Sequence, residues 1–286
     1  MMKSPNWLDR ILYPFAHHTV QLQTGQMHFV DEGKGEPIVF VHGTPTWSFV
    51  WRQQIKALSR THRCIAPDHL GFGLSDKPVD FAYTPEAHAH NLEQLIDQLQ
   101  LKNITLVVHD FGGPIGLSYA LKHPENVKRL VILNTWMWSL ENEAQIMKIS
   151  SFLNGSIGQF LYLNLGFSTR MLLPKGYHQK RHLSKDVHQH YLKPLNNSRN
   201  RIGTWQFAVA LKEAGPWFES LWEQRAKLRA IPMLILWGEK DKLLPLHLLD
   251  QWQQAFPEAE VKRLDAGHFV QEEKGGEIAD MIKHFI

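Results

Sequence analysis

The sequence predicts an α/β protein with a mostly parallel central sheet, helices on both faces of that sheet, and one inserted helical segment. Short runs of β-branched and other apolar residues alternate with helix-like stretches, as in sheets that are covered on both sides. The alternation stops between residues 135 and 229, where helix-like stretches follow one another. It resumes with a strand-like run at residues 232–238 (PMLILWG).

Most of the predicted strands lie in the first half of the chain. Residues 19–31 alternate loosely between apolar and polar side chains and predict a β-hairpin. Continuous apolar runs predict buried strands at residues 37–43, 63–66, 106–108 and 127–133. A helix is expected at residues 53–59. Another is expected at residues 85–99, where Thr84 is suited to cap the first turn and Pro85 occupies the first helical position.

The predicted insertion belongs to a single domain. Helix-like stretches at residues 144–153 and 202–214 fall inside it, and no Ser/Gly-rich linker or internal repeat marks either edge. We therefore expect a core domain formed by residues 1–135 and 230–286, with residues 136–229 as a helical cap.

The composition is that of a soluble globular protein, with 43% hydrophobic and 21% charged residues. The net charge of +3 comes from scattered basic residues, and their densest cluster, at residues 175–185, is interpreted as a solvated face rather than a nucleic-acid site. The single cysteine, Cys64, lies in an apolar run and excludes an intramolecular disulfide. No apolar run reaches the roughly 18 residues of a membrane span, and residues 1–7 do not resemble a secretory signal. A cytoplasmic location without membrane insertion is expected.

A sharp turn from strand to helix is predicted at Asp110. Apolar residues 106–108 lead into His109 and Asp110, and Gly112 follows before the helix-like segment 117–122. This arrangement is a nucleophile elbow, which normally carries serine. A carboxylate held there, near the amides of a helix N-terminus, stays ionised and can attack carbon. Taken alone, the turn favours Asp110 as a helix cap, so the rest of the chain must supply the evidence for a nucleophile.

Two residues near the C-terminus would complete a catalytic triad with Asp110. Asp241 follows the strand that ends at Trp237, and His268 follows a strand-like run at residues 261–264. The order nucleophile, acid, histidine is that of the α/β-hydrolase fold. Asp110 would form an ester, His268 would activate the water that hydrolyses it, and Asp241 would orient His268. Each residue alone could belong to an ordinary turn, but their order favours catalysis.

Backbone amides are expected to form an oxyanion hole beside the nucleophile. The predicted donors are the N–H of Phe111, directly after Asp110, and the N–H of Thr44 in an earlier strand-ending loop. Trp47 and Trp136 are candidates to face the substrate pocket, although aromatic residues near a sheet edge are more often packing residues.

Four motifs resemble those of the haloalkane dehalogenases, at residues 42–47 (HGTPTW), 67–78 (PDHLGFGLSDKP), 109–113 (HDFGG) and 265–272 (DAGHFVQE). The resemblance covers roughly residues 30–135 and 230–286 and is much weaker in the predicted cap. The second and fourth motifs are fairly specific to this branch, whereas the first and third are shared with epoxide hydrolases. The resemblance implies conversion of a haloalkane and water to an alcohol and a halide, with no cofactor and no metal.

The resemblance also implies a role for each residue of the triad. Asp110 would displace the halide to form an alkyl ester, which water activated by His268 would cleave. Some members of the family place the acid after the strand that precedes the cap. That position here is near Asn134, whose amide cannot serve as the acid, so Asp241 keeps the role.

Two positions depart from the dehalogenase pattern. Members of the family usually hold the halide with a tryptophan directly after the nucleophile, plus a side-chain amide in the early loop or a tryptophan of the cap. The first two positions are Phe111, which has no donor, and Thr44, which offers only a hydroxyl. Losing one donor to developing charge typically costs about 3–4 kcal/mol.

These departures leave two alternatives to a haloalkane dehalogenase. A β-lactone decarboxylase of the olefin-biosynthesis type would need no halide site. An epoxide hydrolase would need cap tyrosines to protonate the opening ring. The candidates are Tyr162, Tyr177 and Tyr191, although the pattern favours ordinary amphipathic residues of the cap. A non-catalytic binding protein of this fold would usually lack a triad member. The expected partner is a small apolar organic molecule, and the sequence leaves the oligomeric state open.

Overall fold

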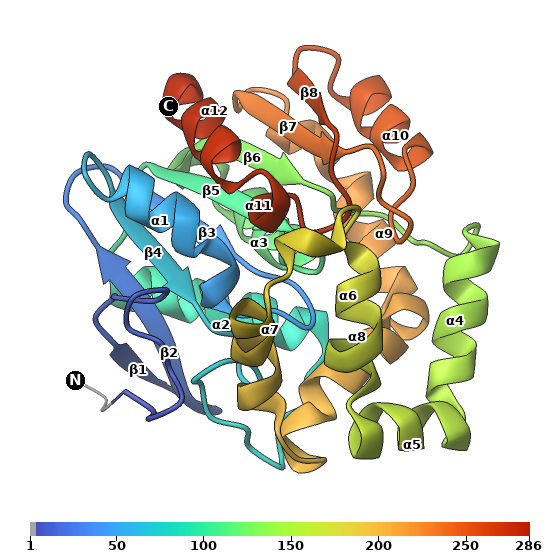
Figure 1. The fold of residues 1–286 in the computed structure, drawn as a ribbon. Coiled ribbons are helices and arrows are strands. Elements are labelled where there is room, and N and C mark those ends of the chain that lie inside the picture. Colours follow the sequence, from blue (N-terminus) through green and yellow to red (C-terminus); the bar gives the residue numbers. More distant parts are fainter. Residues whose placement is uncertain (1–3) are drawn as a thin grey trace.

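The computed structural model describes residues 4–286. Its centre is one eight-stranded sheet with the strand order β1-β2-β4-β3-β5-β6-β7-β8 (Figure 1). β2 runs antiparallel to β1 and β4, and every other neighbouring pair is parallel, so the predicted mostly parallel sheet is confirmed. The strands are β1 His18–Leu22, β2 Gly25–Glu32, β3 Pro37–Val41, β4 Arg63–Pro67, β5 Ile104–His109, β6 Val127–Leu133, β7 Met233–Gly238 and β8 Glu260–Leu264.

The burial of the strands follows their place in the sheet. Every residue of β5 and β7 is buried, as expected for apolar runs that are covered on both faces. β8 lies at the edge, and four of its five residues, Glu260 to Arg263, are exposed or partly exposed. The predicted hairpin is the β1–β2 pair, in which Leu22 lies opposite Gly25.

Helices cover both faces of the sheet. These are α1 Arg52–Leu58, α2 Pro85–Gln98, α3 Gly112–Lys122, α10 His247–Ala255, α11 Val270–Glu273 and α12 Gly275–Phe285. α2, α3 and α10 pack into one apolar cluster, whereas α1 and α12 pack into a second cluster on the other side. Thr84 caps α2 by accepting a hydrogen bond from the N–H of Ala87, as predicted.

α3 is longer than the predicted helix, because it begins at Gly112 rather than near residue 117. Its first turns pack directly on the sheet. A Cβ atom at Gly112 would clash with the carbonyl of Val41 at the end of β3, and one at Gly116 would lie 2.7 Å from Val108 Cγ1 in β5. Only glycine lets the helix approach the strands this closely, and this packing fixes the direction in which the chain leaves β5.

The part of the chain between β6 and β7 is helical, and we call it the helical segment (residues 134–232). It contains α4 Ala144–Asn154, α5 Ser156–Leu165, the π-helical turn η3 Ser168–Leu172, α6 Leu173–Gly176, α7 Lys185–Leu192, α8 Ile202–Glu213 and α9 Gly215–Glu223, joined by short 3-10 turns. Figure 1 shows these helices gathered on one side of the sheet. Within residues 4–286, no helix is long and apolar enough to cross a membrane.

Candidate active site

Asp110 lies in a strained turn directly after β5. Its φ of +53° is in the left-handed region, which a non-glycine residue rarely adopts. The surrounding space is restricted: a Cβ atom at Gly43 would clash with the Asp110 carboxylate, and one at Gly113 would clash with Thr135. The geometry is therefore that of the predicted elbow, with the carboxylate presented at the carboxyl end of the sheet.

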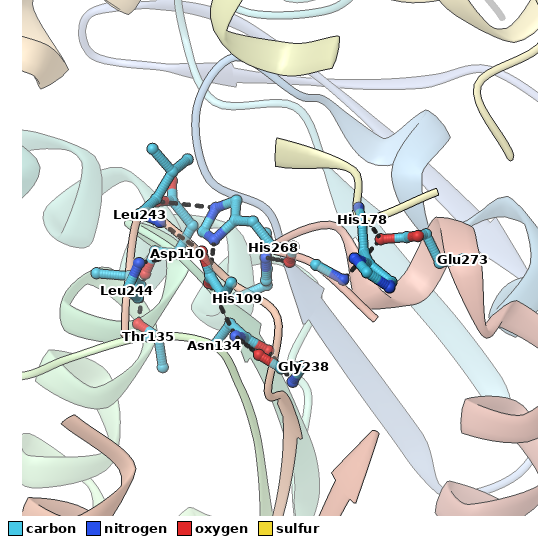
Figure 2. Close-up of polar contacts among 12 residues, drawn as sticks. His109, Asp110, Asn134, Thr135, His178, Gly238, Leu243, Leu244, His268 and Glu273 are labelled. Carbon is cyan, nitrogen blue, oxygen red and sulfur yellow. Dashed lines mark hydrogen bonds and ion pairs between the residues drawn. The ribbon is translucent and has the colours of Figure 1, made fainter. Parts of the chain in front are cut away.

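The structure brings Asp110, His268 and Asp241 together from three separate parts of the chain. His268 Nδ1 is hydrogen bonded to Asp241 Oδ2 at 2.8 Å, and His268 Nε2 lies 3.5 Å from Asp110 Oδ2. Figure 2 shows the imidazole of His268 beside Asp110. An imidazole held between two carboxylates can donate or accept a proton beside Asp110, and its protonated form can stabilise negative charge there.

Asp241 is fixed by hydrogen bonds to both of its oxygens. Oδ1 accepts from the N–H groups of Leu243 at 2.7 Å and Leu244 at 3.0 Å, and Oδ2 accepts from the side-chain amide of Asn134 at 2.8 Å. Asn134 directly follows β6, and its side-chain oxygen Oδ1 accepts a hydrogen bond from the N–H of Gly238 at 2.8 Å. Asn134 therefore holds the carboxylate of Asp241 in place, a role that its amide identity did not reveal in the sequence.

The backbone amides predicted for an oxyanion hole meet the nucleophile itself. The N–H of Thr44 donates to Asp110 Oδ1 at 2.7 Å, and the N–H of Phe111 also favours the ionised carboxylate. Oδ1 is thus held by Thr44, whereas Oδ2 is the oxygen that faces His268.

The charges of the site support one another. Burial alone would raise the pKa of Asp110, but the adjacent His268 outweighs burial and holds that pKa below its usual value. Burial alone would lower the pKa of His268, but Asp241 and Asp110 raise it to about 10. The resting site near neutral pH therefore contains a carboxylate nucleophile beside an imidazolium.

The loop that carries His268 is fastened to both sides of the site. The His268 N–H donates to the carbonyl of Gly176 in the helical segment at 2.7 Å. On the sheet side, His109 Nε2 bonds the carbonyl of His268 at 2.9 Å. Burial lowers the pKa of His109 to about 3, so His109 is neutral and its Nε2–H is the donor.

Glu273 strengthens this attachment and could not be recognised from the sequence. Its buried carboxylate accepts from the N–H groups of Gly267 at 2.7 Å, His178 at 3.0 Å and Gln179 at 2.8 Å (Figure 2). Gly267 directly precedes His268, whereas His178 and Gln179 belong to the helical segment. One side chain therefore connects the histidine loop to the helices that cover the site.

A cavity of about 460 Å³ opens above Asp110 and His268, both of which line it. Its walls are mainly apolar and come from the elbow, the helical segment and the loops after β7 and β8, including Phe111, Leu153, Leu172, Ala208, Leu243 and Phe269. Phe111 stacks on Phe207 with ring centroids 4.5 Å apart, which closes this wall. The cavity suits an apolar molecule that presents one electrophilic carbon to Asp110.

Besides Asp110 and His268, eight polar side chains interrupt the apolar lining: Glu143, Gln145, Lys242 and His247, and the four described next. Thr44 Oγ1, Trp136 Nε1 and Ser168 Oγ are buried and have no hydrogen-bond partner among residues 4–286. Tyr162 lines the same cavity, and burial, followed by the charge of Asp110, raises the pKa of its hydroxyl. Such groups can donate hydrogen bonds to an oxygen atom or a halide inside the cavity.

The structure separates the two tryptophans that were predicted to face the pocket. Trp136 lines the cavity and packs edge-on against Phe111, with centroids 4.9 Å apart. Trp47 is absent from the lining, which corrects that expectation. Its Nε1 donates to the carbonyl of His190 at 2.9 Å, and its ring packs on Tyr13 in the N-terminal segment.

Of the three candidate tyrosines, only Tyr162 reaches the cavity. Tyr191 donates its hydroxyl to the buried Glu272, which also pairs with Arg52. Tyr177 packs on Phe269, which lines the cavity, but Tyr177 itself is not part of the lining. A ring-opening site with two tyrosine donors is therefore not assembled here. Among the described residues, no cluster of three or more His, Cys, Asp or Glu side chains could hold a metal ion.

Comparisons with known proteins agree with this geometry. A family model described as alpha/beta hydrolase fold matches residues 36–275. A cis-3-alkyl-4-alkyloxetan-2-one decarboxylase of Shewanella oneidensis is 39% identical, over 98% of this chain and 90% of that protein. Haloalkane dehalogenase 2 of Mycobacterium tuberculosis is 34% identical, over 96% of each chain. The crystal structure of haloalkane dehalogenase DatA from Agrobacterium tumefaciens superposes with a TM-score of 0.85 at 26% identity, covering 93% of this chain and 94% of that one.

Proposed function

Because this chain belongs to the α/β hydrolase fold family as a haloalkane dehalogenase-like enzyme, we propose that its reaction begins with attack by Asp110 on an electrophilic carbon of an apolar molecule. The observation that carries this proposal is the position of Asp110. Its carboxylate occupies the elbow, lies 3.5 Å from His268 and lines an apolar cavity. A helix cap would need neither the histidine nor the cavity.

The substrate we favour is a β-lactone that carries two alkyl chains. The relative from Shewanella oneidensis is named for such a four-membered lactone, and its match covers nearly the whole chain. Two features of the site support the same choice. Phe111 offers no side-chain donor for a halide, whereas the cationic His268 is suited to hold the carboxylate that lactone opening releases. The apolar cavity suits the alkyl chains.

The lactone reaction can be written without water. Asp110 attacks the ring carbon that bears the ring oxygen, and that carbon–oxygen bond breaks to release a carboxylate while an alkyl ester forms on Asp110. The bond between the neighbouring carbon and the carboxylate then breaks. Its electron pair forms the alkene, CO₂ leaves, and the ester bond breaks to restore the Asp110 carboxylate. His268 stays protonated throughout and Asp241 stabilises its charge.

A haloalkane is the second candidate, and Trp136 is the observation that favours it. Within residues 4–286 its buried N–H has no hydrogen-bond partner, and it lines the cavity with the Thr44 hydroxyl, which also lacks one, so the pair could replace the missing halide donors. Here the ester on Asp110 must be hydrolysed. Formation of the ester removes the negative charge of Asp110, which lowers the pKa of His268. The imidazolium can then release its proton to the solvent, and the neutral ring can accept a proton from the attacking water.

We also propose that residues 136–229 act as a cap that selects the substrate. Helices of this part, together with the loop after β7, supply most of the cavity wall, whereas the catalytic side chains come from the ends of β5, β7 and β8. The proposed localisation is cytoplasmic.

The deciding experiment gives the purified enzyme two sets of compounds, cis-3,4-dialkyl β-lactones and bromoalkanes of matching chain length. Alkene and CO₂ are measured for the first set and bromide for the second. We expect alkene from the lactones, and no product from either set with Asp110→Asn. Asp280→Asn, an exposed substitution on α12, is the matched control and should keep full activity. Bromide without alkene would replace the lactone proposal with the haloalkane one, and activity that survives in Asp110→Asn would refute both.

Trapping the ester separates the two chemistries further. If bromoalkanes are substrates, His268→Phe blocks only hydrolysis, so the alkyl group should remain on Asp110 and appear as a mass increase. If bromide is released and the variant carries no adduct, the two-step scheme fails.

A further inference from the structure

The outer face of the helical segment exposes an unusual set of large apolar side chains. Nine such residues are exposed within residues 4–286, and six of them lie on α4, α5 and η3. They are 48% to 69% exposed, and we call them the apolar patch: Ile149, Phe152, Ile157, Phe160, Leu165 and Met171. Scattered apolar residues on a surface are ordinary, but a concentration of this kind marks a surface that contacts something else.

The patch follows from the way α4 and α5 are packed. Both helices pack on α8 and on each other, so one face of each is covered and the opposite face is free. Figure 1 shows them at the outer edge of the molecule. Ile149 and Phe152 are three residues apart on α4, as are Ile157 and Phe160 on α5, so each pair shares a helix face. α5 contains no charged residue at all. A helix that is apolar on both faces is normally buried on both.

The charged residues on the helices that carry the patch are basic. Within residues 144–172 these are Lys148 and Arg170, which are exposed and directly precede Ile149 and Met171. Two acidic side chains border α4, but each has a partner: Glu143 pairs with His247, and Glu213 accepts a hydrogen bond from Asn154. Two copies of this face would therefore repel each other. An anionic lipid surface offers the opposite charge together with an apolar layer.

The patch is continuous with the mouth of the cavity. Ile149 belongs to the patch and also lines the cavity, and Leu153, Tyr162 and Leu172 line the cavity from the other sides of the same helices. An apolar molecule dissolved in a lipid layer against this face would be next to the opening.

We propose that the apolar patch and its basic surroundings bind the surface of a membrane that contains anionic lipids, without any segment that crosses it. This inference goes beyond the proposed reaction and does not depend on it. The apolar side chains enter the interface while Lys148 and Arg170 contact the lipid head groups, so the cavity opens toward the lipid.

The test is flotation of the full-length protein with vesicles. One set contains phosphatidylcholine alone, and the other contains about one third phosphatidylglycerol. The wild-type protein should float with the second set, and the bound fraction should fall when the salt concentration rises from about 0.1 M to about 1 M. A wild-type protein that floats with neither set overturns the proposal.

Matched variants locate the contact. Ile157→Ser combined with Phe160→Ser should weaken vesicle binding at least about tenfold. Ile11→Ser combined with Val79→Ser removes two exposed apolar residues outside the patch and should leave binding unchanged. Lipid binding that both pairs reduce equally, or that the patch pair leaves intact, contradicts the proposal.

A second pair of substitutions, which reverse charge, tests the proposal if the variant of the apolar patch is poorly folded. Lys148→Glu with Arg170→Glu should weaken binding to the anionic vesicles about tenfold, whereas Lys34→Glu with Lys102→Glu should not. Analytical ultracentrifugation of the same proteins tests whether a second copy of the chain, rather than a membrane, covers the apolar patch. A wild-type dimer that the patch substitutions dissociate, without vesicle binding, would assign the patch to contact between copies of the chain and overturn the membrane proposal. Flotation needs no turnover, so its outcome is separate from the choice of substrate.

Discussion

The sheet and the helical segment use apolar residues in opposite ways. β5 and β7 are six-residue strands in which every residue is buried, because neighbouring strands and two layers of helices surround them. α5 is also rich in apolar residues, but it leaves Ile157, Phe160 and Leu165 exposed. An apolar run thus becomes a rigid frame where both faces are covered and a binding surface where only one is.

Their polar groups differ in the same way. In the sheet region, both oxygens of Asp241 are fully engaged by hydrogen bonds. In the helical segment, the buried hydroxyl of Ser168 lines the cavity and has no hydrogen-bond partner in the part of the chain that the structure describes. The sheet region therefore holds the reacting groups in fixed positions, whereas the helical segment offers groups that a substrate can still engage.

We expect the largest effect from a substitution of Asp241, which lies just after the end of a strand of the sheet. Asp241→Asn keeps the size of the side chain but removes the charge that orients His268 and keeps it protonated. We expect turnover of the better substrate to fall roughly 10³- to 10⁴-fold. Steady-state kinetics measures the loss, and Asp265→Asn, an exposed residue near the same loop, is the control. A fall of less than tenfold would show that His268 does not depend on Asp241.

A pair of phenylalanine substitutions compares the two regions directly. Phe40 on β3 is fully buried and Phe160 on α5 is 55% exposed. Phe40→Ala should lower the free energy of unfolding by about 3–5 kcal/mol, because it leaves a cavity in the core. Phe160→Ala should change that free energy by less than about 0.5 kcal/mol. Urea denaturation measures both values, and equal effects would remove the contrast between the regions.

Glu273 tests the connection between the regions. In the wild-type protein the Glu273 carboxylate accepts hydrogen bonds from backbone N–H groups. In Glu273→Gln, an amide NH₂ would replace one carboxylate oxygen and would face N–H groups that are donors as well. We expect the free energy of unfolding to fall by about 1–3 kcal/mol, and kcat to fall further than the loss of folded protein explains, because the His268 loop is released. Urea denaturation and kinetics are measured together, with the exposed Glu277→Gln as control. A loss of stability with unchanged kcat would limit Glu273 to a structural role.

The smallest expected effect is a change in the pH dependence of stability. Asp241 and Asp110 raise the pKa of His268 from 6.5 to about 10. Protonation of His268 therefore stabilises the fold fully below about pH 6.5, and this contribution is lost as the pH rises toward 10. Asp110→Asn removes one of the two charges, so the loss should occur at lower pH and be smaller by roughly 1 kcal/mol.

Urea denaturation at stepped pH values between 6 and 10 measures this change, with Asp280→Asn as the control. If the wild-type protein and Asp110→Asn lose stability over the same pH range by the same amount, the two carboxylates do not act together on His268.

The sequence predicted the sheet well and placed the candidate site residues at one edge of it, because these signals are local. Apolar runs that end in small or polar residues identify β3, β5 and β7, and residues at the ends of parallel strands meet at one edge. The placement of Asp110, Asp241 and His268 together follows from this rule.

Other parts depend on contacts between distant residues and have no local signal. In the sequence, Glu273 resembles any other residue of a short helix. Its role can be recognised only in the folded structure, where residues 178 and 179 approach it. Trp47 follows the loop of the oxyanion hole, but the N-terminal segment covers its ring. The composition of α5, in the helical segment, does not reveal that only one face of this helix is buried. The predicted cap boundaries at residues 136 and 229 remain a prediction.

Asn134 suggests how a catalytic acid could change its place during evolution. Its amide and the His268 imidazole both approach Asp241 Oδ2 at 2.8 Å, so the residues that follow β6 and β8 meet at one oxygen of the residue that follows β7. Exchanging the two side chains, as Asn134→Asp with Asp241→Asn, would move the negative charge by one strand to a side chain that already contacts this oxygen. Related enzymes could therefore carry the acid on either strand without rebuilding the rest of the site.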